Sequence, residues 1–275
     1  MADTCAVTAL HSYPVKSCQG ASVPSARLTP YGLEGDRQFL VMEGGKFINQ
    51  SRFAKLATVG TRRIDAGTVE FSVGDRSLAH TATPQGEEST IDFYGSSVTV
   101  VDQGEALADL LSEALGRSLR VAAMKDTFER VAPLEEFALV DGTQQAHFVD
   151  LAPILVTNVA SLDDLNGRLD APVPMNRFRP NIVIEGLDAF GEDSIATLEG
   201  DGFRLERATY CERCATTCTD QETGARSSEP LATLKAYRHR ENGFAGGVMF
   251  GAYMAVSGEG TIRVGDELTV TRAAT

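Results

Sequence analysis

Residues 39–48 read FLVMEGGKFI, and this stretch predicts a β-hairpin. Apolar and β-branched residues lie on both sides of Gly44-Gly45, and a glycine pair between two such runs is a hairpin turn signal. Similar short runs occur on either side of it, at residues 7–10, 26–29, 56–61, 69–73 and 97–101. Regularly spaced short strands that are separated by turn residues favour a sandwich or a barrel.

The second half of the chain shows the same pattern. Further strands are expected at residues 154–156, 182–184, 203–207, 249–256, 261–264 and 268–271. Apolar residues recur at helical spacing in 105–115 and 161–169, and residues 231–237 follow Pro230, which favours the first turn of a helix. The sequence therefore predicts a mainly β protein with a few helices. Residues 125–145 are charged and weakly periodic, so we expect two domains, 1–125 and 126–275.

Charge and hydropathy exclude several classes of protein. The 275 residues include 38 acidic and 25 basic side chains, for a net charge of -13, and such a surface repels the phosphate backbone of nucleic acids. No apolar run approaches the roughly 20 residues that a membrane span needs. Residues 1–10 do not resemble a secretory signal. We therefore expect a cytoplasmic protein that binds neither nucleic acid nor a membrane.

The five cysteines indicate metal or redox chemistry. Their number is odd and no secretory signal is evident, so a disulfide framework is not expected. Three of them gather in residues 210–220, YCERCATTCTD: these are Cys211, Cys214 and Cys218. Several thiols at such close spacing, in a reducing compartment, are typical of a metal or redox site.

Spacing alone leaves several interpretations of these thiols open. Structural zinc needs a fourth ligand, for which only His239 is near, and the iron–sulfur spacing of radical enzymes fits poorly. A redox dithiol of Cys211 and Cys214 expects a βαβ setting that this strand-rich region lacks. A single thiolate on a soft transition metal is the remaining metal hypothesis, and Arg213 would help to keep the Cys214 thiol ionised. Buried cysteines that only pack are an equally open interpretation.

Cationic side chains occur beside turns in three distant segments. They are Lys16, followed by Ser17, in Tyr13-Pro14-Val15-Lys16-Ser17; Arg37 in Gly35-Asp36-Arg37; and Arg177 and Arg179 before the strand expected at 182–184. The planar fork of arginine suits phosphate because it can bond two oxygens at once. A common anion site for these segments is a hypothesis that the spacing suggests.

The chain resembles a known family in ordered motifs along most of its length. Residues 7–62, with Tyr-Pro-Val-Lys-Ser and Gly-Asp-Arg-Gln-Phe-Leu-Val, resemble the N-terminal β-barrel domain that precedes a MOSC domain. Residues from 154 onward resemble the MOSC β-barrel domain itself, through Phe-Arg-Pro-Asn-Ile-Val, Arg-Cys and Phe-Gly-Ala-Tyr. The pattern is similar to the family of the mitochondrial amidoxime-reducing component and its bacterial relatives.

This resemblance implies a molybdenum–pyranopterin cofactor whose metal takes one protein thiolate, at the catalytic position matching Cys214. The other residues that fall on cofactor-binding positions are Lys16, Ser17, Arg37, Asn158, Arg179, Arg213, Thr217 and Tyr253. One departure concerns Cys218, which stands where the family usually has a second threonine. This difference puts the hydrogen bonding of the Thr217 loop in doubt.

The function implied by the resemblance is reduction of N-hydroxylated compounds such as amidoximes, hydroxamic acids and N-hydroxylated bases. The sequence has no flavin fingerprint and no second metal motif, so we expect a separate electron donor: a ferredoxin-like protein, a flavoprotein or a haem protein. The alternative is a cofactor carrier or sulfur-handling module without turnover of its own. A zinc-stabilised interaction module is a third class that metal analysis would distinguish.

Overall fold

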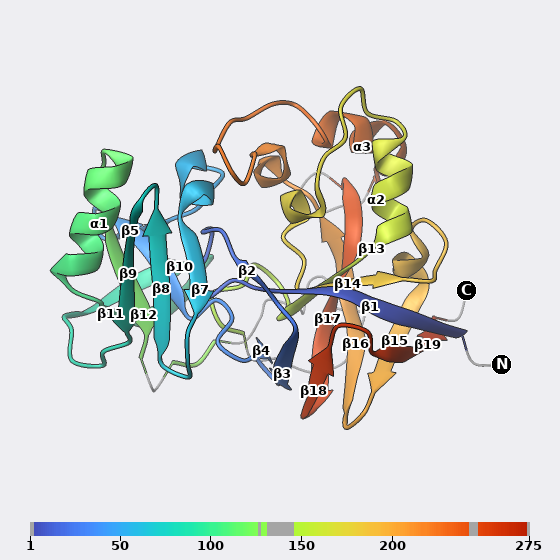
Figure 1. The fold of residues 1–275 in the computed structure, drawn as a ribbon, viewed down its shortest axis with the longest axis horizontal. Coiled ribbons are helices and arrows are strands. Elements are labelled where there is room, and N and C mark those ends of the chain that lie inside the picture. Colours follow the sequence, from blue (N-terminus) through green and yellow to red (C-terminus); the bar gives the residue numbers. More distant parts are fainter. Residues whose placement is uncertain (1–2, 126–127, 131–145, 242–246, 274–275) are drawn as a thin grey trace.

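The computed structural model describes residues 3–125, 128–130, 146–241 and 247–273. Figure 1 shows two β-rich halves side by side: strands β5 to β12 with helix α1 form one half, and strands β13 to β19 with α2 and α3 form the other. Strand β1 runs along the second half and leads toward the first.

The strands are, in chain order, β1 (Asp3–Ser12), β2 (Ala21–Val23), β3 (Ser25–Thr29), β4 (Gly32–Leu33), β5 (Phe39–Glu43), β6 (Lys46–Ile48), β7 (Gly60–Arg63), β8 (Thr68–Val73), β9 (Arg76–Thr81), β10 (Glu88–Phe93), β11 (Ser96–Asp102), β12 (Arg120–Met124), β13 (Ile154–Asn158), β14 (Ile182–Glu185), β15 (Ile195–Gly200), β16 (Phe203–Glu212), β17 (Met249–Gly258), β18 (Gly260–Arg263) and β19 (Glu267–Arg272). The helices are α1 (Glu105–Leu115), α2 (Val159–Asn166) and α3 (Leu231–Tyr237), with the 3-10 turns η1 (Ala54–Thr58), η2 (Met175–Phe178), η3 (Gly191–Ser194) and η4 (Ala215–Cys218). The prediction of a mainly β protein with few helices is confirmed.

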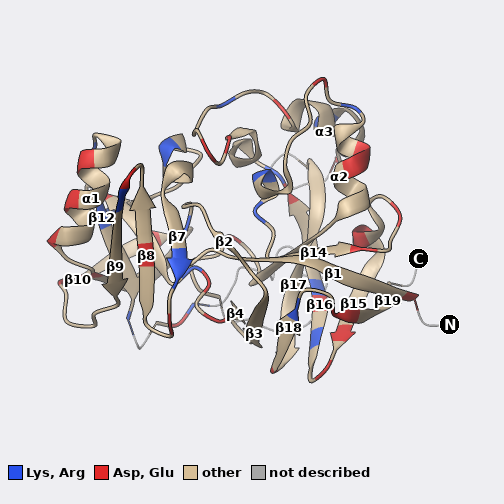
Figure 2. Cartoon of the chain, viewed as in Figure 1, with Lys and Arg blue, Asp and Glu red and all other residues tan. Residues whose placement is uncertain are grey.

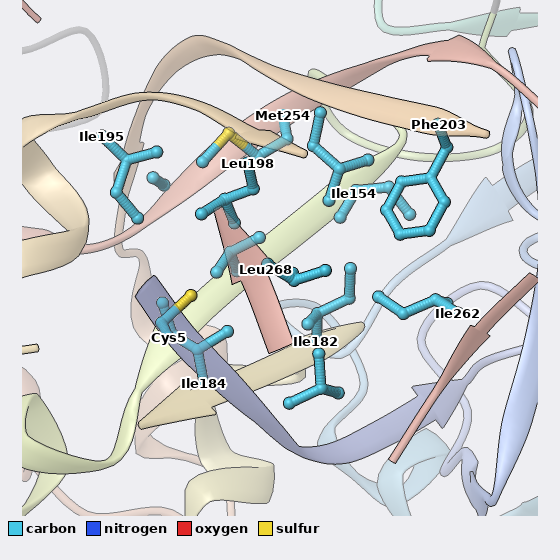
Figure 3. Packing of buried hydrophobic residues seen from close by; sticks show 14 of the residues in the cluster. Cys5, Ile154, Ile182, Ile184, Ile195, Leu198, Phe203, Met254, Ile262 and Leu268 are labelled. Carbon is cyan, nitrogen blue, oxygen red and sulfur yellow. The ribbon is translucent and has the colours of Figure 1, made fainter. Parts of the chain in front are cut away.

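Seven strands close into a barrel. Their order is β14-β13-β17-β16-β15-β19-β1, and β1 pairs with β14 to complete the ring. Inside it, Cys5, Ile154, Ile182, Ile184 and Leu268 point toward one another in a fully apolar core (Figure 3). Strands β13 and β14 are parallel, which requires a crossover connection, and α2 lies in that connection.

The other half is built from two smaller sheets and a helix. One sheet has the order β10-β11-β12-β5-β6 and the other β7-β8-β9. Helix α1 buries Leu107 and Leu111 in the core that these sheets share. A third sheet, β18-β3-β4, joins the N-terminal segment to the end of the chain.

The two halves of the structure are not two consecutive parts of the sequence. Strands β1 and β3 pair with strands that follow residue 180, and β2 and β4 pair with β1 and β3, so the start of the chain belongs structurally to the barrel. The two-domain division at residues 125 and 126 remains a prediction. Residues 126–127 and 131–145, part of the charged segment on which it was based, lie outside the described residues.

Most expected elements are present, and the differences have local causes. The hairpin is confirmed as β5 and β6, which pair Glu43 with Lys46 across the two glycines. The strand expected at 56–61 is wrong in its first half, because residues 54–58 form η1 before β7 begins. The helix expected at 161–169 begins two residues earlier, where Asn158 caps α2. No helix in the described part of the chain is long and apolar enough to cross a membrane.

Candidate functional site

A cavity between the two halves gathers the residues that the sequence had placed far apart. Eight of the nine expected site residues line it: Lys16, Ser17, Arg37, Arg179, Arg213, Cys214, Thr217 and Tyr253. Lys16, Ser17 and Arg37 lie in the turns between β1 and β5, whereas the other five belong to the later half or to the turns that end its strands. The hypothesis of a common site for the distant cations therefore agrees with the geometry.

Strained backbone concentrates at this cavity. Among the described residues other than glycine, five have a positive φ, and four of these line the cavity: Ser17 (67°), Arg37 (48°), Tyr94 (52°) and Arg179 (54°). A side chain with a β-carbon is sterically disfavoured in this region, and such residues cluster at functional sites in proteins. Each of these four strained turns brings a side chain to the wall of the cavity.

Tyr13 holds two of the arginines together. The guanidinium carbons of Arg37 and Arg179 each lie 4.4 Å from the centre of its ring. The Tyr13 hydroxyl donates to the carbonyl of Pro180 at 3.1 Å, and burial raises the pKa of this phenol to about 12. Two like charges are thus separated by a neutral aromatic ring that attracts both. Tyr13 was not among the expected site residues, because its role depends on contacts between distant segments.

Lys16 is buried and forms an ion pair. Its Nζ lies 2.5 Å from Oδ1 of Asp150 and donates to the carbonyl of Phe148 at 3.2 Å. The ammonium group also lies 5.1 Å from the ring centres of Phe93 and Tyr94. Burial lowers the pKa of Lys16, and the Asp150 carboxylate opposes that effect. Asp150 is a site residue that the sequence analysis missed.

A pair of buried glutamines joins the two halves behind the cavity. Gln50 and Gln221 exchange side-chain hydrogen bonds of 2.9 and 3.1 Å. Gln50 also donates to the carbonyl of Ser17 at 2.8 Å. Arg179 donates to the carbonyl of Cys18 at 2.7 Å and to Gln221 at 3.2 Å. The network fixes Arg179 against the turn that carries Lys16 and Ser17.

The three cysteines that are clustered in sequence have different surroundings in the structure. Cys211 and Cys218 are buried, whereas Cys214 is exposed and lines the cavity. The carbonyl of Cys214 accepts hydrogen bonds from the backbone N–H of Thr217 at 3.1 Å and from its hydroxyl at 2.6 Å. Thr217 therefore fixes the backbone at the start of η4, and the Cys214 thiol is accessible to a ligand.

The side chain of Arg213 donates its hydrogen bonds to partners other than Cys214. Its Nη1 donates to Sγ of Cys211 at 2.7 Å, and its Nη2 donates to the carbonyl of Phe178 at 2.7 Å. That Arg213 helps to keep Cys214 ionised stays a prediction. In extended backbone, residues two positions apart lie on the same side. Tyr253 also forms a side-chain hydrogen bond with Cys211. Cys211 thus positions two residues of the cavity lining.

Asn158 does not line the cavity. Its side chain is buried, accepts from the backbone N–H of Ala160 at 3.4 Å and donates to the carbonyl of Asp188 at 2.8 Å. These contacts cap α2 and anchor the segment that follows β14. In this structure Asn158 supports the fold and does not face the other expected site residues.

The ligand set for structural zinc is absent from the part of the chain that the structure describes. It contains no group of three or more His, Cys, Asp and Glu side chains that could hold a metal ion. The donor set at the cavity is a single exposed thiol beside four cationic side chains, Lys16, Arg37, Arg179 and Arg213.

Comparisons with known proteins agree with this architecture. The model of the MOSC N-terminal beta barrel domain matches residues 4–118, and that of the MOSC domain matches residues 143–269. Mitochondrial amidoxime-reducing component 1 is 33% identical over 273 residues in Mus musculus and 32% identical over 274 residues in Homo sapiens; each alignment covers 94% of this chain, and 80% and 81% of those proteins. Molybdenum cofactor sulfurase of Oryza sativa subsp. japonica is 30% identical over 280 residues, which are 94% of this chain and 34% of that protein. The chain therefore belongs to the MOSC-domain family that includes the mitochondrial amidoxime-reducing components.

Proposed function

We propose that this chain holds a molybdenum–pyranopterin cofactor in the cavity and reduces N-hydroxylated compounds with electrons from a separate donor protein. The observation that carries the proposal is the exposed Cys214 thiol, which lines the same cavity as Arg37, Arg179 and Arg213. Relatives of similar length that are named amidoxime-reducing components support the choice of reaction.

The residues present fit such a cofactor. A thiolate is a soft ligand of the kind that transition metals bind, and guanidinium groups bond phosphate oxygens in pairs. In the described part of the chain Lys16 and Arg37 are paired with aspartates, whereas neither Arg179 nor Arg213 forms an ion pair. Nε of Arg213 is buried without a hydrogen-bond partner, which an acceptor on a ligand would supply. Arg179 and Arg213 are therefore the cations that would neutralise a bound phosphate.

The chemistry of the proposed reaction divides between cofactor and protein. When bound, the cofactor supplies the exchange of two electrons that breaks an N–O bond. Reduction of an amidoxime to an amidine consumes two electrons and two protons and releases water. The chain supplies the Cys214 ligand, held in place by Thr217, and a cavity that orients the substrate.

A proton route is part of the proposal. The carboxylate of Asp150 is 59% exposed and contacts the ammonium group of Lys16, which is 6% exposed. The ammonium group of Lys16 lines the cavity and is the proton donor of the proposal. Burial opposes ionisation of Asp150, but the attraction of Lys16 outweighs that effect and lowers the pKa of Asp150 to about 2, so the carboxylate stays ionised and orients Nζ. Two protons are needed in each turnover, and Lys16 would donate to the released oxygen and be protonated again from solvent.

A cofactor carrier or sulfur-handling module is the second candidate function. The observation that favours it is the similarity to a molybdenum cofactor sulfurase, of which this chain matches about a third. A carrier would hold the same cofactor through the same residues but would not turn over substrate.

Turnover measurements distinguish the two. We would measure reduction of benzamidoxime by dithionite-reduced methyl viologen, with protein from a host that makes the cofactor. We expect activity in the wild type and none in Cys214→Ser, because a serine oxygen is a harder and far less acidic ligand. Cys211→Ser and Cys218→Ser should keep a substantial part of the activity. If the cofactor-loaded wild type reduced no N-hydroxylated substrate, the reductase would be contradicted and the carrier function would be favoured.

A further inference from the structure

Four exposed cationic side chains lie beside the loop that carries Cys214. They come from two segments and will be called the basic face: Arg52 and Lys55 at η1, and Arg226 and Lys235 at the turn before α3 and within it. The chain as a whole carries a net charge of -13, opposite in sign to the basic face.

Several contacts bring the two segments together. The side chain of Arg226 donates to the carbonyl of Gln50, two residues before Arg52. Gly224 lies against η1 so closely that an added β-carbon would be 3.3 Å from Cα of Lys55. Figure 1 shows the loop after η4 arching toward η1 at the upper side of the molecule, and Figure 2 shows cationic positions on both.

The basic face adjoins the cavity. Ser51, the neighbour of Arg52, lines the cavity together with Cys214 and Thr216. On the other side of η4, a shallow groove with almost wholly apolar walls is lined by Ala215, Cys218, Arg226, Leu231, Ala232 and Lys235. The loop that holds Cys214 therefore lies between the cavity and a groove whose edges are cationic.

Within the described residues these four charges have no acidic partner, although Arg226 also has a structural role through its hydrogen bond to the carbonyl of Gln50. In the described residues none of them forms an ion pair, although eighteen ion pairs are present elsewhere. Acidic residues of the same segments are Asp220, which pairs with Arg177, and Glu222 and Glu229. An apolar groove with unpaired cations at its edge has the apolar centre and polar rim that are typical of protein interfaces.

We infer that the basic face docks a small acidic one-electron carrier protein, which delivers electrons at the Cys214 loop. This inference rests on the proposed function, since only a reductase needs such a donor. The overall charge of the chain repels an acidic protein, so the basic face would both attract the carrier and orient it.

The test uses charge reversal on the loaded enzyme. We would measure the KM for a reduced acidic plant-type [2Fe–2S] ferredoxin, with benzamidoxime as substrate, in wild type and in Arg52→Glu/Lys55→Glu. Neither side chain donates a hydrogen bond in the described structure, so the fold should be unaffected. The matched control is Lys46→Glu/Arg263→Glu, which reverses two exposed, unpaired cations on β6 and β18 that do not line the cavity.

We expect the Arg52→Glu/Lys55→Glu variant to raise the KM for ferredoxin by at least about tenfold at low salt, since steering changes encounter rates by 10 to 10³. Its rate with reduced methyl viologen should equal that of the wild type, because a small dye does not need to dock. The control variant should match the wild type in both assays. Equal effects of the two double variants, or no effect of either, would overturn the docking inference.

Failure of the proposed function gives a different pattern. A wild type that reduces nothing with the viologen dye contradicts the proposed reductase, and calorimetric titration of ferredoxin into the protein then decides the inference. Binding that is lost in Arg52→Glu/Lys55→Glu alone supports the basic face as a docking site. A wild type that is active with the dye but neither binds nor accepts electrons from ferredoxin overturns the docking inference alone.

Discussion

Replacing Tyr13 tests whether the cavity depends on the ring between its two arginines. The Tyr13→Leu substitution removes the contacts with Arg37 and Arg179, each at 4.4 Å, and the hydrogen bond to Pro180. Cation–π contacts at a desolvated site are worth about 1–2 kcal/mol each, and the hydrogen bond about 1 kcal/mol. We therefore expect a loss of about 3–5 kcal/mol in the free energy of unfolding. The Tyr13→Phe substitution keeps the ring and should cost about 1 kcal/mol.

The assay is urea unfolding of the purified variants, together with their pterin content after gel filtration. Tyr13→Phe should retain the cofactor, and Tyr13→Leu should lose most of it, because the two guanidinium groups would no longer be held side by side. The control is Tyr31→Leu, since Tyr31 is 36% exposed and stacks on His147, and among the described residues the ring of Tyr13, and not that of Tyr31, contacts Arg37 and Arg179. Equal losses of stability in Tyr13→Phe and Tyr13→Leu would refute the reasoning about the ring.

Substitutions of Arg179, Glu192 and Cys211 test the charge, the burial and the hydrogen bonding of single side chains. Arg179→Ala should lose most bound pterin, measured after gel filtration, because each charge-assisted bond is worth roughly 1.5–3 kcal/mol; pterin equal to wild type would contradict this. Glu192→Gln should stabilise the protein at pH 8 by up to about 3 kcal/mol and have little effect at pH 4. Burial raises the pKa of Glu192 to about 7, so the wild type loses stability as the pH rises from the unfolded value near 4.5 through 7, and urea unfolding at both pH values checks this. Cys211→Ala should reduce cofactor content more than Cys211→Ser, since only serine keeps an acceptor for Arg213.

Regular elements were predictable where periodicity was strong. The leucines of α1 recur at helical spacing and Gly116 ends the helix in the left-handed conformation, so both bounds were predicted correctly. Strands β9 and β10 were missed because most of their residues are exposed and supply little apolar alternation. Their formation depends on pairing with neighbouring strands, which a local pattern does not reveal.

Most of the site residues expected from the sequence line the cavity, but the sequence did not predict how their side chains contact one another. Spacing left the three cysteines equivalent, and only burial separates Cys214 from the other two. Arg213 bonds to Cys211, two positions away, because alternate residues of extended backbone lie on the same side. Adjacency in the sequence had suggested Cys214 instead. Tyr13 and the glutamine pair Gln50 and Gln221 act across 166 and 171 positions, respectively, and such contacts are set by the tertiary fold. The family resemblance indicated eight residues that line the cavity, and the structure shows which side chains and carbonyls they contact.

We propose that the Cys214 thiol and the surrounding arginines hold a molybdenum–pyranopterin cofactor. Elemental and pterin analysis of the purified protein, from a host that makes this cofactor, tests the claim most directly. We predict molybdenum and pterin equimolar with the wild-type chain, and molybdenum strongly depleted in Cys214→Ser but retained in Cys218→Ser. Wild-type protein that contains no molybdenum, or zinc in its place together with equal losses in Cys211→Ser and Cys214→Ser, would contradict it.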